Sequence, residues 1–341
     1  MTAVGVLLSP QILEWMGTPE SVMAESTTYL QIYFSGSMGF VMYNVFVGIL
    51  QAIGDSRHPL YYLIISSVMN LLLDILFIGG GVHTDVGGAA LAMVISQAFS
   101  AVLCFIQLIR TNDSYRLRIK KIRFDAKMLG QIICIGLPSG GQNSIIAFAN
   151  VIVQSYINAF GPMAMAGYGA YSKIEGFAFL PINSFTMAIT TFVGQNLGAG
   201  QTERAKSGAR FGILTTAILA ELIGVGVFLL APQLIAAFDS TPEVIRLGAE
   251  KARTAALFYF LLAYSHSVAS ILRGAGKAVV SMTIMMVFWC VVRVLFLAVS
   301  IPLTHAIQMI YVVYPLTWTL SSVVFFFYYR RAGWMEHAHA N

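Results

Sequence analysis

Long apolar runs, separated by short polar or glycine-containing connections, dominate the chain from end to end. A helix that crosses about 30 Å of hydrocarbon needs about 20 apolar residues. Runs of about that length or longer occur at 26–50, 60–79, 88–109, 129–160, 163–195, 209–231, 250–272, 279–299 and 304–328. The apolar start of the chain adds a partial run. The pattern predicts an all-α polytopic membrane protein with nine full transmembrane helices and a partial first one.

The two halves of the chain share short motifs at a nearly constant offset. Residues 10–13 return at 232–235, residues 18–20 at 241–243 and residues 49–54 at 271–276, with offsets of 222, 223 and 222. Similarity at a fixed period is typical of duplicated transporters and predicts two pseudo-symmetric helical lobes. More chain precedes the second copy than the first, by roughly 96 residues. We therefore expect the natural start of the protein to be missing.

The composition excludes a water-soluble globule. The chain is 57% hydrophobic and only 10% charged, too little polar surface for a globule in water. The sequence has no HExxH, no GxSxG and no Cys-His metal spacing, so we expect no enzyme and no bound cofactor. It also lacks an ATP-binding motif. Any pumping must therefore draw on an ion gradient.

Basic residues collect on one side of the predicted membrane layout. Alternate loops carry 15 of the 20 Lys and Arg, which by the positive-inside rule places these loops and the C-terminus in the cytoplasm of an inner-membrane protein. On the opposite face, the only basic residues are Arg246, Lys251 and Arg253. The basic stretch from Arg110 to Lys127 can indicate nucleic acid or acidic lipid, but a cytoplasmic linker between two lobes explains it as well, and we expect no nucleic-acid partner.

The predicted organisation follows from this linker. We expect an incomplete N-lobe at 1–109, the basic linker at 110–128, a C-lobe at 129–331 and a tail at 332–341.

Ionisable residues inside spans are candidates for function because burying them in lipid is costly. They are Asp74, Lys173, Glu175, Glu221, His266 and Arg293. Asn70 lies one helical turn before Asp74, so an amide oxygen and a carboxylate share one face, which suits a proton-binding acid or an oxygen-coordinated Na+. The alternative is a structural hydrogen bond between helices.

The second half of the chain offers candidates for a substrate cavity. Arg293 either pairs with an acid such as Glu221 or faces the cavity, and Lys173 and Glu175, two positions apart, point to different sides of their helix. The other candidates, which either line a path for flat organic cations or pack between helices, are Gln142, Asn143, Tyr168, Tyr171, Tyr264 and His266.

Several motifs together resemble the multidrug and toxic compound extrusion (MATE) family. They are residues 188–200, Gly136-Leu137-Pro138, residues 272–277, and Asn70 with Asp74 before residues 87–92. The resemblance implies two six-helix lobes around a central cavity, with alternating access coupled to inward Na+ or H+. It also implies that the chain runs from the end of the third span to the twelfth.

The family's N-lobe cation site matches this chain only in part. Asn70 and Asp74 match its Asn and Asp, but the first span is absent and Met93 stands in place of a threonine. Ile146 occupies the position where some members carry a glutamate. A complete Na+ site is therefore less expected than proton coupling.

The leading hypothesis is a monomeric secondary active antiporter that exports small amphipathic or cationic organic compounds. One alternative is a flippase for lipid-linked saccharides of the same superfamily, which should have a more basic cavity. The other is a membrane scaffold or inactive fragment that transports nothing.

Overall fold

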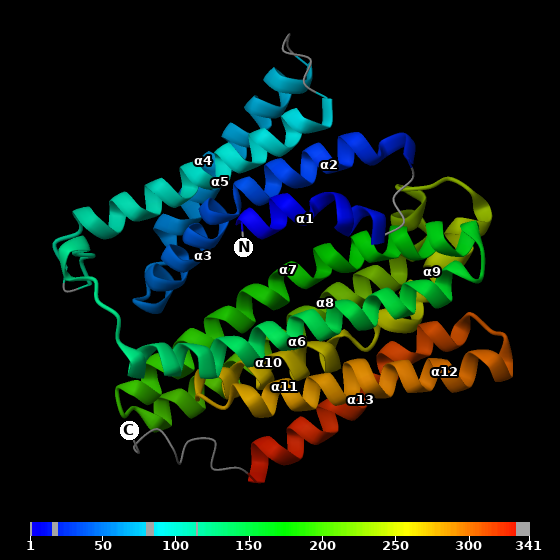
Figure 1. Ribbon diagram of the computed structural model, residues 1–341. Helices are drawn as coiled ribbons and strands as arrows, with labels where there is room; N and C mark the ends of the chain where they lie inside the picture. Colours follow the sequence, from blue (N-terminus) through cyan, green and yellow to red (C-terminus); the bar gives the residue numbers. More distant parts are fainter. Residues whose placement is uncertain (1, 16–19, 80–84, 114, 332–341) are drawn as a thin grey trace. The chain divides into compact units, whose positions relative to one another are not determined.

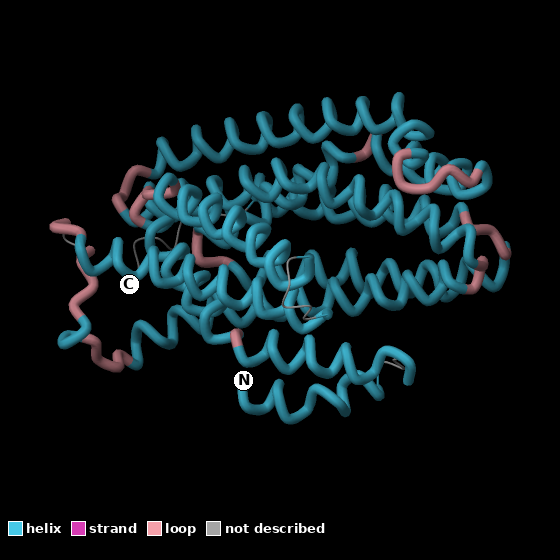
Figure 2. Tube along the Cα trace, turned by 90° about the horizontal axis from the view of Figure 1, so that it is seen from above, coloured by secondary structure: helices cyan, strands magenta, loops and turns pink. Residues whose placement is uncertain are grey.

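The computed structural model describes residues 2–15, 20–79, 85–113 and 115–331, and every regular element in these ranges is a helix. Figure 2 shows these helices joined by loops, without a strand in the described part of the chain. The all-α prediction is therefore confirmed. The chain divides into two compact units, Met1–Arg123 and Phe124–Asn341, and each is described by itself below.

The first unit is built around the long helix α5 (Asp85–Arg110) (Figure 1). α2 (Glu20–Ser35), α3 (Ser37–Ala52) and α4 (Arg57–Asp74) pack against α5, and α1 (Thr2–Trp15) packs against α2. Leu50, Cys104 and Leu108 form its small buried core, where α3 meets α5. A π-helical segment, η1 (Ile75–Gly79), continues α4, and the 3-10 turn η2 (Ile119–Lys121) lies in the basic stretch.

In its described residues, the second unit contains eight α-helices and a larger core. They are α6 (Ala126–Asn158), α7 (Pro162–Gly198), α8 (Thr202–Ala236), α9 (Pro242–Ala256), α10 (Tyr259–Gly274), α11 (Ala278–Met286), α12 (Arg293–Thr304) and α13 (Gln308–Arg331). The π-helical segment η3 (Val287–Val292) joins α11 to α12. α7 and α8 pack on each other and on both α9 and α10, and α13 packs on α9 and α10.

Small residues allow the close approach of helices within this unit. A methyl group at Gly224 of α8 would overlap the backbone carbonyl oxygen of Ala256, at the end of α9. Glycine at the contact therefore lets the two backbones meet, as is common between membrane helices.

Two predicted spans are broken. Within the described residues, seven helical segments are long and apolar enough to cross a membrane, or up to nine if each of two bent pairs is one span. The run 26–50 is divided between α2 and α3 with a bend of 43°, and the run 250–272 belongs to α9 and α10, which bend by 54°. The second run also begins earlier than expected, since α9 starts at Pro242.

The bent pairs show the internal repeat in three dimensions. α2 begins at Glu20 and α9 at Pro242, and each pair ends in a turn that contains a left-handed glycine, Gly54 with φ 88° and Gly276 with φ 78°. Glycine adopts this conformation at no steric cost, so the matching glycines of the sequence repeat mark matching turns. Thr18 and Pro19, and the predicted tail at 332–341, lie outside the described residues.

The basic stretch is shorter than expected as a linker. α5 ends at Arg110 and α6 already begins at Ala126, capped by the Asp125 carboxylate, which accepts hydrogen bonds from the backbone N–H groups of Lys127 and Met128. The boundary between the two units falls at Arg123, inside this stretch.

Candidate functional site

A polar cavity of about 450 Å³ lies within the second unit. Its walls come from α6, α7, α10, η3, α12 and α13, and its lining residues are Asn143, Ile146, Asn150, Gln154, Tyr168, Ser172, Glu175, Phe179, His266, Trp289, Arg293, Tyr314 and Trp318. Three ionisable side chains and several aromatic rings thus face one space, from segments far apart in the sequence. Five of the predicted cavity residues line it: Asn143, Tyr168, Glu175, His266 and Arg293.

Arg293 is the principal cation of the cavity wall. Its side chain is only 2% exposed, and its guanidinium donates to Asn150 Oδ1 at 3.2 Å and, at 3.5 Å, to Thr317 Oγ1. Both acceptors are neutral, and Arg293 Nε has no hydrogen-bond partner. The guanidinium carbon lies 4.5 Å from the ring centre of Tyr314 and 5.6 Å from that of Trp289.

The ion pair considered between Arg293 and Glu221 does not form. A carboxylate oxygen of Glu221 instead accepts the backbone N–H of Phe260 at 3.2 Å, which satisfies a donor at the start of α10. Among the described residues, no carboxylate lies within ion-pair distance of Arg293. Arg293 lines the cavity instead.

Glu175 is the acid of the cavity, and it is held by a buried tyrosine. The hydroxyl of Tyr171 donates to Glu175 Oε1 at 2.8 Å and lies 3.3 Å from the hydroxyl of Tyr259. Tyr171 is fully buried and positions the carboxylate from behind rather than lining the cavity itself. One turn away, the hydroxyls of Tyr168 and Tyr314 lie 2.6 Å apart and join α7 to α13.

A buried lysine lies behind this wall, and the sequence interpretation placed it wrongly. Lys251 was assigned to a loop on the outer side, but it belongs to α9 and is fully buried. Its Nζ has no hydrogen-bond partner and lies 3.5 Å from the ring centre of Tyr314 and 5.2 Å from that of Tyr171.

A sequence signal for this burial exists. On a helix starting at Pro242, Lys251 falls in register with the apolar face, because that face recurs three to four residues apart. The residues that share this buried face are Val244, Leu247, Gly248, Ala252 and Ala255.

The side chains of His266 and Trp289 contact each other in the cavity wall. Their ring centres are 5.1 Å apart in an edge-to-face arrangement, and His266 Nε2 has no hydrogen-bond partner. The indole Nε1 of Trp289 donates to Ser321 Oγ at 3.1 Å, and Ser321 in turn lies 3.0 Å from the hydroxyl of Ser265. The Trp289 ring is therefore held in place by Ser321 of α13 and by His266 of α10.

Three other candidates of the second unit lie outside the cavity lining. Lys173 is exposed, with its ammonium 5.2 Å from the ring centre of Phe238, consistent with its pointing away from Glu175. Gln142 is buried, and its Oε1 has no hydrogen-bond partner. Tyr264 is half-buried and packs against the core.

In the first unit, Asn70 and Asp74 lie on α4 and both are half-exposed. Asp74 is the last residue of α4, directly before η1, just as Arg293 directly follows η3. π-helical segments are frequent at functional sites, so both charged residues adjoin a local irregularity of their helices. No group of three or more His, Cys, Asp or Glu side chains that could hold a metal ion occurs in the described ranges.

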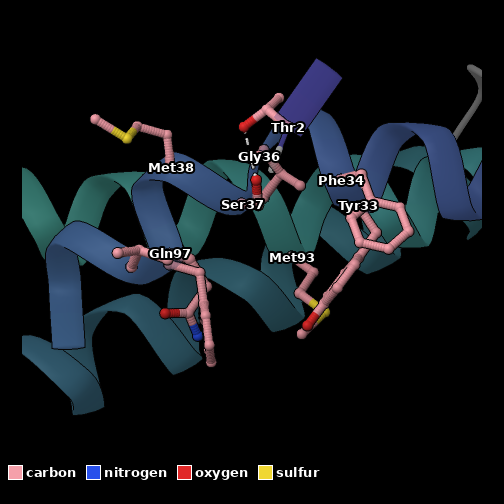
Figure 3. A pocket seen from close by; sticks show the side chains of 11 residues that line it. Thr2, Tyr33, Phe34, Gly36, Ser37, Met38, Met93 and Gln97 are labelled. Carbon is pink, nitrogen blue, oxygen red and sulfur yellow. Dashed lines mark hydrogen bonds between the residues drawn. The ribbon is translucent and has the colours of Figure 1, made fainter. Parts of the chain in front are cut away.

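A second hollow of about 430 Å³ occurs in the first unit, between α2, α3 and α5 (Figure 3). Its walls are mainly apolar and include Tyr33, Phe34 and Met93, the residue at the expected threonine position. Asn70 and Asp74 do not line it. The hydroxyls of Thr2 and Ser37 lie 2.8 Å apart, and the hydrogen bond between them (Figure 3) ties α1 to α3 beside this hollow.

Comparison with known proteins agrees with this architecture. The MatE family model matches residues 1–76 and 138–299. The probable multidrug resistance proteins YoeA and YpnP of Bacillus subtilis are 24% and 27% identical to the chain over 97% of its length, and the chain spans 73% and 74% of theirs. A solved MOP superfamily transporter of Pyrococcus furiosus superposes with a TM-score of 0.92 at 19% identity, covering 100% of this chain and 76% of that one. The chain therefore belongs to the MatE family of multi-pass membrane transporters.

Proposed function

We propose that the protein is a secondary active antiporter of the inner membrane. It exports small amphipathic organic compounds, cations among them, in exchange for H+ or Na+. Support comes from the relatives named as multidrug resistance proteins. The observation that carries the proposal is the polar cavity, where Glu175, His266 and Arg293 face one space among apolar helices. Such groups are costly inside a membrane protein unless they serve a water-filled path or a ligand.

In this proposal the cavity of the second unit binds the transported compound. Tyr168, Phe179, Trp289, Tyr314 and Trp318 supply aromatic surface, and Asn143, Asn150 and Gln154 supply amides. A cavity that combines aromatic rings with several polar groups suits flat amphipathic molecules. Tyr171 contributes by holding Glu175.

Asp74, with Asn70 one turn before it, takes the coupling ion. Binding of a proton or Na+ cancels the charge of Asp74, so it changes the cost of exposing that carboxylate and shifts the balance between inward- and outward-open states. The basic loops and the C-terminus face the cytoplasm, and the protein works as a monomer.

The test is efflux of a fluorescent dye from proteoliposomes with an imposed pH or Na+ gradient. We expect gradient-driven efflux by the wild type and none by Asp74→Asn. The amide of asparagine is neutral and cannot take up and release a proton, so it cannot couple the ion gradient to transport. Asp113→Asn is the matched control, since Asp113 is an exposed carboxylate in the basic stretch and should retain efflux. Gradient-driven efflux that persists in Asp74→Asn would refute the assignment of Asp74, and absence of efflux in the wild type would refute the transport proposal.

A further inference from the structure

Basic side chains outnumber acidic ones around the cavity of the second unit. Arg293 and Lys251 are the two basic groups, and Glu175 supplies one carboxylate. Both basic groups lie close to one ring, since Lys251 Nζ is 3.5 Å and the Arg293 guanidinium carbon 4.5 Å from the ring centre of Tyr314. The carboxylate is already engaged by the hydroxyl of Tyr171.

The hydrogen-bond donors of this region are also in excess. Arg293 Nε, Lys251 Nζ and Trp318 Nε1 are buried and have no partner. An unpaired buried cation is among the costliest groups in a protein interior, and the two acceptors of Arg293 are a neutral amide and a neutral hydroxyl. A guanidinium presents a planar set of donors that matches an oxyanion.

We propose that Arg293 binds an oxyanion, a carboxylate or phosphate group, of the transported compound. This inference rests on the proposed function and narrows its substrates to amphipathic compounds that carry such a group, zwitterions included. The aromatic body of the compound contacts Trp289 and Tyr168, and the oxyanion completes the hydrogen bonding of Arg293. Lys251 adds positive potential from behind Tyr314 without touching the compound.

The test is a binding series with one ring system and three charges. 2-Naphthoate, 2-naphthamide and 2-naphthyltrimethylammonium are titrated by equilibrium dialysis against the purified full chain in phosphatidylcholine nanodiscs, with protein-free discs subtracted. We expect the carboxylate to bind about tenfold more tightly than the amide, the effect of one hydrogen bond to a charged group. Equal affinities, or tightest binding of the trimethylammonium compound, would overturn the inference without any variant.

Variants then locate the preference. Arg293→Gln should remove it, and Arg293→Lys should keep part of it, since a lysine retains the charge but not the planar donors. The matched control is Arg253→Gln, which removes one exposed cation from α9 and should leave the preference unchanged. If Arg293→Gln does not yield folded protein, Arg293→Lys still decides, because an unchanged preference in that variant argues against the planar contact.

Two further arms separate the possible sources of the oxyanion and the two proposals. The binding is repeated in discs that contain phosphatidylglycerol, and loss of the carboxylate preference there assigns the site to a lipid phosphate and overturns the assignment to transported compounds. Efflux that depends on Asp74 without a carboxylate preference defeats this inference alone. A carboxylate preference without gradient-driven efflux defeats the proposed function.

Discussion

The ammonium group of Lys251 lies 3.5 Å from the ring centre of Tyr314, in a place where its nitrogen has no hydrogen-bond partner. The rings of Tyr171 and Tyr311 lie farther off, at 5.2 Å and 5.9 Å. Contacts of this kind are worth about 0.5 to 2 kcal/mol each, whereas removing an ammonium from water costs several kcal/mol. The three tyrosine rings around the ammonium group therefore offset only part of the free-energy cost of burying Lys251.

Replacing this lysine by methionine should not destabilise the protein. Lys251→Met keeps the unbranched chain and most of the volume but removes the buried charge, so we expect an unchanged or higher midpoint of thermal unfolding. Lys251→Ala also removes the charge but leaves a cavity, and it should be about 2 to 5 kcal/mol less stable than Lys251→Met. Thermal unfolding of both variants in detergent checks this pair. A drop for Lys251→Met as large as that for Lys251→Ala would show that the ammonium itself stabilises the fold.

Two glycines of α8 that are two residues apart, and therefore lie on different faces of the helix, should respond oppositely to the same substitution. Gly224→Ala places a methyl group against the carbonyl oxygen of Ala256, which forces α8 away from α9 and should cost about 1 to 3 kcal/mol. Gly226→Ala meets no atom and should stabilise the helix by about 0.5 to 1 kcal/mol. Thermal unfolding, monitored by elution on size exclusion, measures both. Equal effects would mean that the α8–α9 contact does not have this geometry.

The hydrogen bond between Trp289 and Ser321 should be visible in fluorescence. Ser321→Ala leaves the buried indole N–H without an acceptor, with an expected loss of about 1 to 3 kcal/mol and a shifted Trp289 emission. Ser322→Ala is the matched control, because Ser322 donates to the carbonyl of Leu261 and leaves the indole bond in place. The Trp289 signal is the difference between each variant and the same variant with Trp289→Phe. An unchanged emission in Ser321→Ala would argue against this contact.

The proposed orientation can be tested with two cysteines in a cysteine-free background. Asn112→Cys lies in the basic stretch and Ser240→Cys in the turn between α8 and α9, and both native residues are exposed. With the basic loops in the cytoplasm, an impermeant maleimide should label Ser240→Cys in intact cells and Asn112→Cys only in inverted vesicles. The reverse labelling pattern would show that the protein has the opposite orientation in the membrane. Labelling of both cysteines from the same side would show that the predicted number of spans between them is wrong.

The order of apolar runs, the helical class and the family resemblance were all readable from the sequence. The reason is physical: the thickness of a bilayer dictates how long an apolar run must be, and that length needs no knowledge of packing. The repeat of residues 49–54 at 271–276 likewise predicted two related lobes, and its glycines do mark matching turns at Gly54 and Gly276. Ionisable residues could be named as candidates from their place inside such runs alone.

Only the tertiary structure decided which of these candidates meet. Glu175, His266 and Arg293 come from α7, α10 and α12 and share one cavity, while Lys173 points to Phe238 and Tyr171 supports Glu175 from behind. The sequence interpretation counts Lys251 with the outer loops, whereas in the structure it lies on α9, which bends by 54° against α10, and is fully buried. Run length records how deep a residue lies along a helix, but the direction of its side chain depends on how that helix is rotated and bent against its neighbours. That rotation is set by packing between helices, which a hydropathy pattern does not contain.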